Sequence, residues 1–167
     1  MDNTQNVPLD VTVRILTAPK ELPAIKCSQI LLPTTTGTTA ILKNHAPLMS
    51  ALDIGLVRIK EKHGIWTPIF ICTGGVAIIR KNIVKITIFT IEEVFDEDLD
   101  KLNKLVEEAK LELTQVKTTK ARLDAVLKLK RSMGRYEGSR LMKIKKAKLE
   151  ELKLKNLGTQ KWNFNNF

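Results

Sequence analysis

The chain has 167 residues, of which 43% are hydrophobic and 28% charged, and its formal net charge is +10. This length suits one ordinary domain, or a small domain with an appendage, and the composition is globular rather than disordered. No apolar run approaches the roughly 20 residues that a spanning helix needs, so the sequence predicts a chain that does not cross a bilayer. The start of the chain carries no basic or Arg-rich pattern, so no targeting segment is expected.

The charge is unevenly distributed along the chain. Residues 1–100 hold 10 basic and 11 acidic residues, whereas residues 101–167 hold 18 basic and 7 acidic ones. The first part is therefore nearly neutral and the second is strongly basic. This asymmetry predicts two domains with different tasks.

Residues 9–90 have the pattern of β-strands. Val11, Val13 and Ile15 alternate with Thr12 and Arg14, the two-residue period of a half-buried strand. Similar alternation covers 84–88, and further short strand-like runs lie at 27–32, 38–42, 48–52, 56–60, 66–71 and 76–80. Because Gly, Asn and Pro separate these runs, the sequence predicts a β-sandwich or flattened barrel.

Two of the turn signals are glycines inside apolar sequence. Gly55 lies between the runs 48–52 and 56–60, and Gly74–Gly75 precedes the run 76–80. Gly74–Gly75 is too short a motif to predict a nucleotide-binding loop, and a strand bend or bulge is the favoured interpretation.

The apolar period changes from two to three and four residues after Phe95. One stripe of an amphipathic helix contains Leu99, Leu102, Leu105, Val106, Ala109, Leu113 and Val116. Asp96 or Asp98 is expected to cap this helix at its N-terminus. Thr118–Thr119 then interrupts the pattern before a second stripe, which predicts an antiparallel helical hairpin.

Gly134 and Gly138 lie inside the second helical stretch. Each glycine costs about 1 kcal/mol relative to Ala in a helix, so they predict a break or a hinge. A basic helical pattern resumes at Leu141 and is expected to run to about residue 157, after which the end frays. The predicted fold class is an all-β N-terminal sandwich followed by an α-helical hairpin, with segments 1–95, 96–138 and a basic extension at 139–167.

The sequence encodes no catalytic or metal-binding constellation. It lacks a phosphate-binding loop, a nucleophile elbow and a dinucleotide fingerprint, so no enzymatic activity is expected. Cys27 and Cys72 lie in strand-like sequence and are interpreted as buried free thiols. His45 and His63 lie in different loops without metal-ligand spacing, and His45 is interpreted as a contact residue.

The basic helices allow three interpretations. Between Lys117 and Lys161 there are 15 basic residues against four acidic ones. This surface could be solvated, could bind nucleic acid, or could bind an acidic protein partner. Tyr136 is the only aromatic residue between Phe95 and Trp162, which favours a protein partner because nucleic-acid modules usually interleave aromatic residues. A basic nucleic-acid-binding protein with a β scaffold remains the alternative.

Several motifs, taken in order, resemble a known family. They lie at Thr34–Thr39, Leu42–Pro47, Asp53–Ile59, Thr73–Ala77, Asn82–Ile88 and Leu129–Glu137. Together, over roughly residues 9–138, they resemble the epsilon subunit of rotary F-type ATP synthases, especially the plastid and bacterial forms.

The resemblance implies a non-catalytic role in the central stalk. In that family the sandwich contacts the gamma subunit and the c-subunit rotor ring, and so couples ring rotation to the catalytic head. By position, the gamma contacts would be Asn44, His45, Ala46 and Pro47, and the ring contacts would be Thr35, Thr36, Gly37 and Thr38. The ring-facing loop of the family often carries an acidic residue, whereas this chain has threonines, so hydrogen bonding rather than charge would mediate that contact.

The resemblance also implies regulation by the helical hairpin. In relatives the hairpin can extend along gamma, and its basic residues reach acidic segments of the catalytic beta subunits, and of alpha, and inhibit ATP hydrolysis. The corresponding residues here are Lys128, Lys130, Arg131 and Arg135. Such charge-assisted contacts are expected to weaken with salt.

ATP binding by the subunit is not expected, since Asn103 and Lys104 replace the Arg and Ala of the family's nucleotide motif. The resemblance and the abundance of Lys, Asn and Ile favour the stromal side of a plastid (chloroplast) thylakoid membrane. The cytoplasmic side of a bacterial plasma membrane is the alternative.

Overall fold

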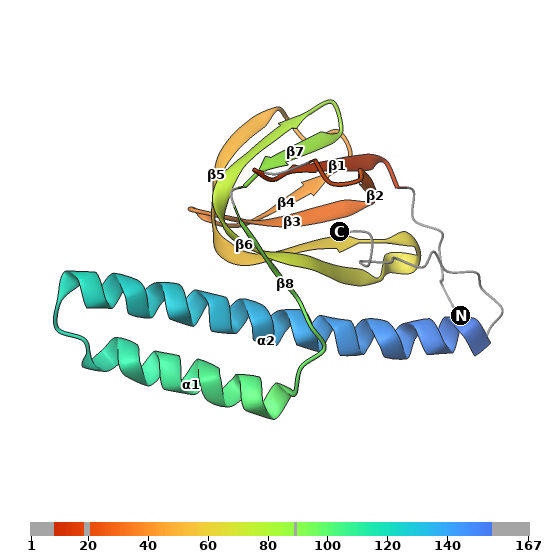
Figure 1. The fold of residues 1–167 in the computed structure, drawn as a ribbon. Helices are drawn as coiled ribbons and strands as arrows, with labels where there is room; N and C mark the ends of the chain where they lie inside the picture. Colours follow the sequence, from red (N-terminus) through yellow and green to blue (C-terminus); the bar gives the residue numbers. More distant parts are fainter. Residues whose placement is uncertain (1–8, 19–20, 89, 155–167) are drawn as a thin grey trace.

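The computed structural model describes residues 9–18, 21–88 and 90–154. A β-sandwich lies along one side of a long helical hairpin (Figure 1). The strands are β1 (Val11–Leu16), β2 (Ile25–Cys27), β3 (Gln29–Thr34), β4 (Gly37–Leu42), β5 (Leu48–Lys60), β6 (Trp66–Arg80), β7 (Ile83–Thr87) and β8 (Ile91–Glu93). The helices are α1 (Leu99–Gln115) and α2 (Thr119–Leu154). The predicted class, a β-sandwich followed by an α-helical hairpin, is confirmed. The predicted frayed end lies outside the described residues.

The strands follow the order β2-β1-β7-β6-β5-β3-β4, and β8 pairs with β6. Only β1 and β7 pair in parallel; the other described pairs are antiparallel. The long strands β5 and β6 pair with each other, and each changes its other partner along its length. β6 pairs with β8 through Phe70–Cys72 and with β7 through Val76–Arg80, whereas β5 pairs with β3 mainly through its last three residues. Because β5 and β6 take part in both layers, a single sheet forms the two layers seen in Figure 1.

The glycines within β5 and β6 mark bends rather than turns. The runs 48–52 and 56–60 are one strand, as are 66–71 and 76–80, so the prediction of separate strands there was wrong. The predicted strand bend at Gly74–Gly75 is confirmed. Gly75 has φ +146°, and a Cβ on it would lie 2.3 Å from the Thr87 carbonyl oxygen, so only glycine lets β6 pass β7 this closely.

The sandwich core is formed by the inward-facing half of each alternating strand. Val11, Val13 and Ile15 are at most 1% exposed, as their period predicts, and Phe70 is the largest of the fully buried side chains among the described residues. Cys27 and Cys72 are buried free thiols, as predicted. Burial raises the pKa of Cys27 to about 12 and also raises the pKa of Cys72, so both thiols are inert under ordinary conditions.

The helical hairpin forms where the sequence predicts it. The Asp98 side chain caps α1 by accepting a hydrogen bond of 2.9 Å from the Asp100 amide. The chain reverses between Gln115 and Thr119, and α1 buries Leu102, Val106 and Ala109.

The predicted break at Gly134 and Gly138 is wrong, because α2 is continuous from Thr119 to Leu154. Both glycines are buried where α2 lies closest to the sandwich. A Cβ on Gly138 would lie 2.5 Å from Cγ1 of Val94, and one on Gly134 would lie 3.4 Å from Cγ1 of Ile71. The glycines therefore serve close packing rather than bending. The boundary expected at 138/139 does not coincide with any change in secondary structure.

Candidate functional site

The loop between β4 and β5 contains the four predicted gamma-contact residues, Asn44, His45, Ala46 and Pro47. All four lie at the surface, and His45 is the least exposed of them. The Asn44 amide donates a hydrogen bond of 2.6 Å to Oδ1 of Asn82, which fixes the loop to the β6–β7 turn. His45 Nδ1 lies 2.7 Å from the Ala46 carbonyl oxygen. The loop is thus held in one conformation while its outer surface stays free.

An exposed apolar surface lies on the outer face of the sheet, on strands joined to this loop and to the β6–β7 turn. It consists of Met49, Val76, Ile78 and Ile83, which are 69%, 40%, 40% and 43% exposed, and we call it the apolar sheet face. Met49 and Ile78 are direct partners across β5 and β6, and Ile83 faces the same side from β7. Adjacent exposed apolar side chains on one face are typical of a protein interaction site.

The sequence analysis missed the apolar sheet face, although a signal for it was present. The pairs Leu48–Met49 and Ile78–Ile79 are apolar at consecutive positions. Only one face of a strand can point into the core, so one member of each pair must face outward. Ile79 is the buried member of its pair, and Leu48 is the partly buried member of the other.

The turn between β3 and β4 contains the predicted ring-contact residues, Thr35, Thr36, Gly37 and Thr38. All four are exposed, and none is charged. The buried Thr34 hydroxyl donates a hydrogen bond of 2.6 Å to the Gly37 carbonyl oxygen and lies 3.1 Å from the Thr36 hydroxyl. This turn and the Asn44 loop are at opposite ends of β4, so the sandwich presents two separate surfaces.

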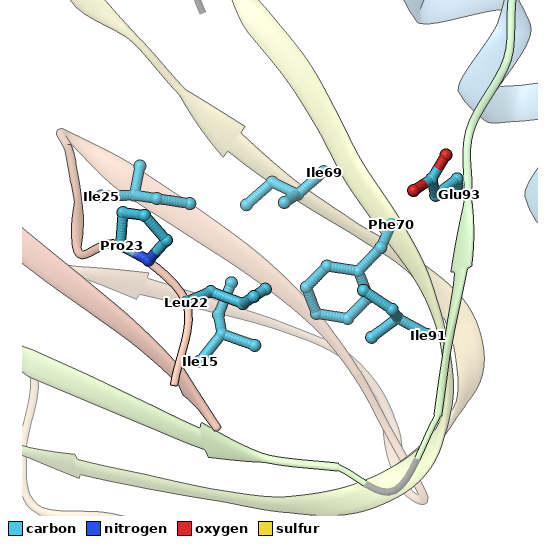
Figure 2. Close-up of a pocket in the computed structure, with 8 residues that line it drawn as sticks. All are labelled: Ile15, Leu22, Pro23, Ile25, Ile69, Phe70, Ile91 and Glu93. Carbon is cyan, nitrogen blue, oxygen red and sulfur yellow. The ribbon is translucent and has the colours of Figure 1, made fainter. Parts of the chain in front are cut away.

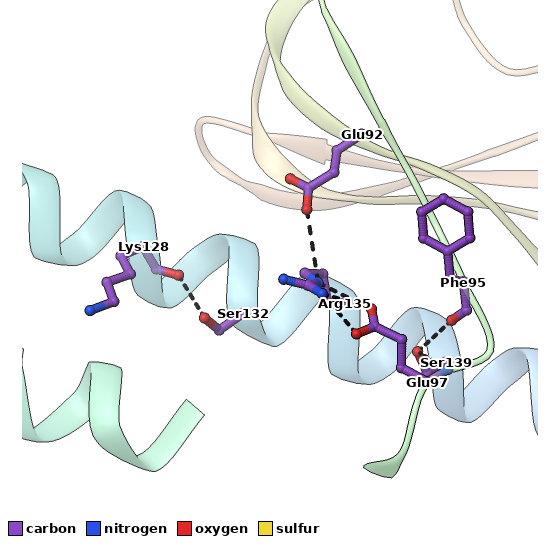
Figure 3. A network of polar contacts seen from close by, with 7 residues as sticks. All are labelled: Glu92, Phe95, Glu97, Lys128, Ser132, Arg135 and Ser139. Atoms are coloured by element: carbon purple, nitrogen blue, oxygen red, sulfur yellow. Dashed lines mark hydrogen bonds and ion pairs between the residues drawn. The ribbon is translucent and has the colours of Figure 1, made fainter. Parts of the chain in front are cut away.

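The four predicted inhibitory residues all lie on α2, but three of them are already paired with carboxylates of the same chain. Lys130 is hydrogen-bonded to Asp53 on β5, and Lys128 pairs with Glu112 on α1. Two nitrogens of Arg135 donate to Glu97, with Nη2 at 2.7 Å from Oε2 (Figure 3). Among the described residues, Arg131 is the only one of the four without an ion pair.

These contacts belong to a wider polar interface between α2 and the sandwich with its linker. Figure 3 shows Arg135 between Glu97 and the more distant Glu92, and Ser139 donating a hydrogen bond of 2.6 Å to the Phe95 carbonyl oxygen. The ion pairs of α2 with residues 53–97 are Lys130–Asp53, Arg135–Glu92, Arg135–Glu97, Glu137–Arg58, Lys145–Glu61 and Lys146–Asp96. The hydrogen bond from Lys130 lowers the pKa of Asp53, and that from Lys146 lowers the pKa of Asp96.

The acidic partners were also missed at the sequence level. The sequence pattern predicts only a helix cap at Asp96 or Asp98, a role that Asp98 fills, and it assigns no role to Glu92. The near-neutral count of residues 1–100 concealed that their acids gather opposite α2. Because much of the basic surplus has a counter-surface within the chain, the argument for nucleic acid as its partner is weakened.

An open cleft with a volume of about 570 Å³ lies between β5 and the two helices, and its lining includes Gly55, Asn103 and Lys130. The cavity lined by Ile15, Phe70 and Ile91 has a volume of about 30 Å³, room for about one water molecule (Figure 2). Within the described ranges, no group of His, Cys, Asp and Glu is suited to a metal ion. Asn103 and Lys104 are exposed on α1, and whether ATP binds there stays a prediction. No helix among the described residues combines the length and apolarity needed to span a membrane.

Comparison with known proteins adds independent information. Residues 10–94 match the family model "ATP synthase, Delta/Epsilon chain, beta-sandwich domain". The chloroplastic ATP synthase epsilon chain of Trieres chinensis is 39% identical over 128 residues, which cover 77% of this chain and 95% of that one. That of Pylaiella littoralis is 43% identical over 101 residues, covering 60% of this chain and 75% of that one.

A solved structure has the same fold. A chain in the mitochondrial ATP synthase of Euglena gracilis superposes with a TM-score of 0.61 at 20% identity, covering 78% of this chain and 81% of that one. Since 128 residues are 95% of the Trieres relative, that relative has about 135 residues, against 167 here. This chain is therefore longer than that relative by about 32 residues.

Proposed function

The chain belongs to the ATP synthase epsilon chain family, and on that premise we propose that it is a non-catalytic central-stalk subunit of a plastid ATP synthase. The sandwich binds the gamma subunit and rests on the c-subunit ring, so that ring rotation reaches the catalytic head. The relatives are named as chloroplastic proteins, which supports a location in the plastid. We place the subunit peripherally on the stromal side of the thylakoid membrane.

The observation that carries this proposal is the apolar sheet face beside the Asn44 loop. Burying Met49 and Ile78 against gamma would remove exposed apolar surface from water, which is the main driving force of stable association. The loop is fixed to the β6–β7 turn, so little conformational freedom is lost when a partner binds. Together the two features form one continuous contact surface for gamma.

The Thr35–Thr38 turn at the other end of β4 is suited to the ring. It is exposed and uncharged, and its conformation is fixed by the Thr34 hydroxyl. Hydroxyl groups can exchange hydrogen bonds with polar loops as the interface adjusts, without the cost of removing a charge from water. The contact therefore needs no complementary charge on the ring.

We further propose that the hairpin restrains ATP hydrolysis when it leaves the sandwich. In the structure described here Lys128, Lys130 and Arg135 are occupied by carboxylates of the same chain, so this docked arrangement is the non-inhibitory one. Acidic segments of the catalytic beta and alpha subunits would compete for the same cations. The hairpin is thus a two-state element whose position depends on which carboxylates hold its basic residues.

The coupling role is tested by binding to the matching gamma subunit assembled with its catalytic head. Met49→Asp and Ile78→Asp should each raise the Kd about tenfold or more, because a carboxylate would be buried in an apolar contact. Leu111→Asp is the matched control, since Leu111 is 60% exposed but lies on α1. A Kd that changes equally for all three variants, or for none, would overturn the assignment of this face to gamma.

A further inference from the structure

We infer that residues 139–154, the C-terminal part of α2, are an intramolecular clamp that closes on the β5–β6 turn and holds the hairpin against the sandwich. We call residues 139–154 the clamp segment and residues 61–65 the clamped turn. The inference concerns contacts within the chain. Only its regulatory consequence rests on the proposed function.

The first observation is a buried stripe on α2 that continues through the clamp segment. Its members follow one another at steps of four, three, four and seven residues: Gly134, Gly138, Leu141, Lys145 and Leu152. Gly134 and Leu152 are 18 residues apart, which is about five helical turns, so they face the same side. Leu141 is 7% exposed and Leu152 is 3% exposed. The face that packs on the sandwich thus continues past the predicted end of the hairpin.

The second observation is the ion pair between the clamp segment and the clamped turn. Lys145 Nζ donates a hydrogen bond of 3.0 Å to Oε1 of Glu61. The side chains are only 17% and 15% exposed, which makes this the most buried ion pair among the described residues. Removing one member of a buried pair leaves an uncompensated charge, so this contact responds strongly to substitution.

The third observation is that the clamped turn is covered, although turns between strands ordinarily lie in solvent. Ile65 is 4% exposed but does not belong to the sandwich core cluster. Both ring nitrogens of His63 are buried, with no hydrogen-bond partner among the described residues. Lys145 binds Glu61 at the start of this turn, and Figure 1 shows α2 running past the β5–β6 turn, so we assign the cover of the turn to the clamp segment.

The clamp segment is also fixed at its start. The Ser139 hydroxyl donates to the Phe95 carbonyl oxygen, and Lys146 pairs with Asp96, so the linker before α1 is held as well. Because α2 is one continuous helix, Lys130 and Arg135 cannot swing away from Asp53 and Glu97 while the clamp segment stays closed. Release of the clamp is therefore the step that frees the inhibitory residues.

The Trieres relative is shorter than this chain by about 32 residues. The 128 aligned residues are 77% of this chain, so about 39 of its residues lie outside that match.

Amide hydrogen exchange of the full-length chain tests the clamp directly, without gamma or the catalytic head. Lys145→Met and Glu61→Gln should each accelerate exchange of the amides at 141–152 about tenfold or more. The control is Lys148→Met, which changes an exposed neighbour that forms no ion pair within the described part of the chain, and it should leave exchange unchanged. The exchanged pair Lys145→Glu with Glu61→Lys should restore slow exchange. If Lys145→Met exchanges no faster than Lys148→Met, the clamp is overturned.

ATP hydrolysis by the catalytic head with gamma tests the consequence separately. Lys145→Met should inhibit hydrolysis several-fold more strongly than the unmodified chain, because its hairpin is released more often. Lys148→Met should inhibit like the unmodified chain. Faster exchange of Lys145→Met with unchanged ATP hydrolysis would overturn the regulatory consequence but would still support the clamp. Failure of the clamp and failure of the proposed function therefore give different results.

Discussion

The sandwich and the docked hairpin are stabilised by different physical forces. The sandwich has one apolar core of inward-facing side chains such as Phe70, Ile86 and Val13, all 2% exposed or less. The face of α2 that packs on the sandwich instead combines two close-packed glycines and the buried Leu141 and Leu152 with ion pairs, most of which are partly exposed. Apolar burial involves no charge that salt can screen or that pH can titrate, whereas partly exposed ion pairs respond to both.

This difference separates a permanent scaffold from a removable part. Partly exposed ion pairs contribute little individually, and a competing carboxylate can replace them at small net cost. A core residue has no such replacement. The molecule can therefore release its hairpin without unfolding its sandwich, which is what a subunit that both couples and regulates requires.

Adding a methyl group at Gly138 should break the hairpin contact and leave the sandwich intact. The Cβ would lie 2.5 Å from Val94, so Gly138→Ala should destabilise docking by about 1–3 kcal/mol. The control is Gly134→Ala, whose Cβ would lie at an ordinary 3.4 Å from Ile71 and should add about 1 kcal/mol of helix stability. Exchange protection of α2, compared with that of β7, measures both effects. Equal loss of protection in α2 and β7 would show that docking and folding are not separable.

These two glycines also show where sequence reasoning stops. Helix propensity alone makes Gly134 and Gly138 a weak point, and that prediction failed because tertiary packing against Ile71 and Val94 outweighs about 1 kcal/mol per glycine. Close packing also explains Gly55, which lies inside one continuous strand and not between two. A Cβ on Gly55 would lie 2.7 Å from Pro33 Cβ. A position can require glycine because a residue that is distant in sequence packs against it. A single sequence does not reveal which residue that is.

Fold class and local signals were predictable because they depend on periodicity. The sequence predicts the alternation at Val11–Ile15, a helix cap at Asp96 or Asp98 and the reversal near Thr118. The structure confirms the strand and the reversal, and it places the cap at Asp98. The pairing of Lys130 with Asp53 was not predictable, since it joins residues 77 positions apart. Whether Asn44–Pro47 and Thr35–Thr38 make the proposed contacts stays a prediction, because no partner is present.

A substitution at Arg131 can distinguish the two proposed roles of the basic residues, which are docking of the hairpin and inhibition of ATP hydrolysis. It is exposed and forms no ion pair with any residue that the structure describes, so Arg131→Ala should leave α2 protected from exchange while weakening inhibition of ATP hydrolysis several-fold. Lys130→Ala should both loosen docking and remove an inhibitory contact, so its net effect on hydrolysis should be smaller. Arg122→Ala, at the exposed start of α2, is the control. Unchanged inhibition with Arg131→Ala would remove this residue from the inhibitory surface.

The smallest expected effect is a pH dependence confined to the hairpin. The hydrogen bond from Lys130 lowers the pKa of Asp53 from its model-compound value of 3.8. A carboxylate whose pKa is lower in the folded state contributes stability that is fully present above about pH 4 and is lost as the pH falls through its folded pKa. Docking of α2 should therefore weaken below pH 4, while β7, held by apolar burial, should respond less.

Asp53→Asn should remove part of this pH dependence, because the amide cannot ionise. The dependence that remains is assigned to Asp96, whose pKa Lys146 also lowers. The measurement is exchange protection of α2 relative to β7 at pH 3 and pH 6, corrected for intrinsic exchange rates, with Asp124→Asn as an exposed control on the same helix. If Asp53→Asn and Asp124→Asn reduce the dependence equally, the effect reflects the overall charge of α2 rather than the Lys130 contact. A larger reduction with Asp53→Asn assigns it to the one ion pair that joins β5 to the inhibitory residues of the hairpin.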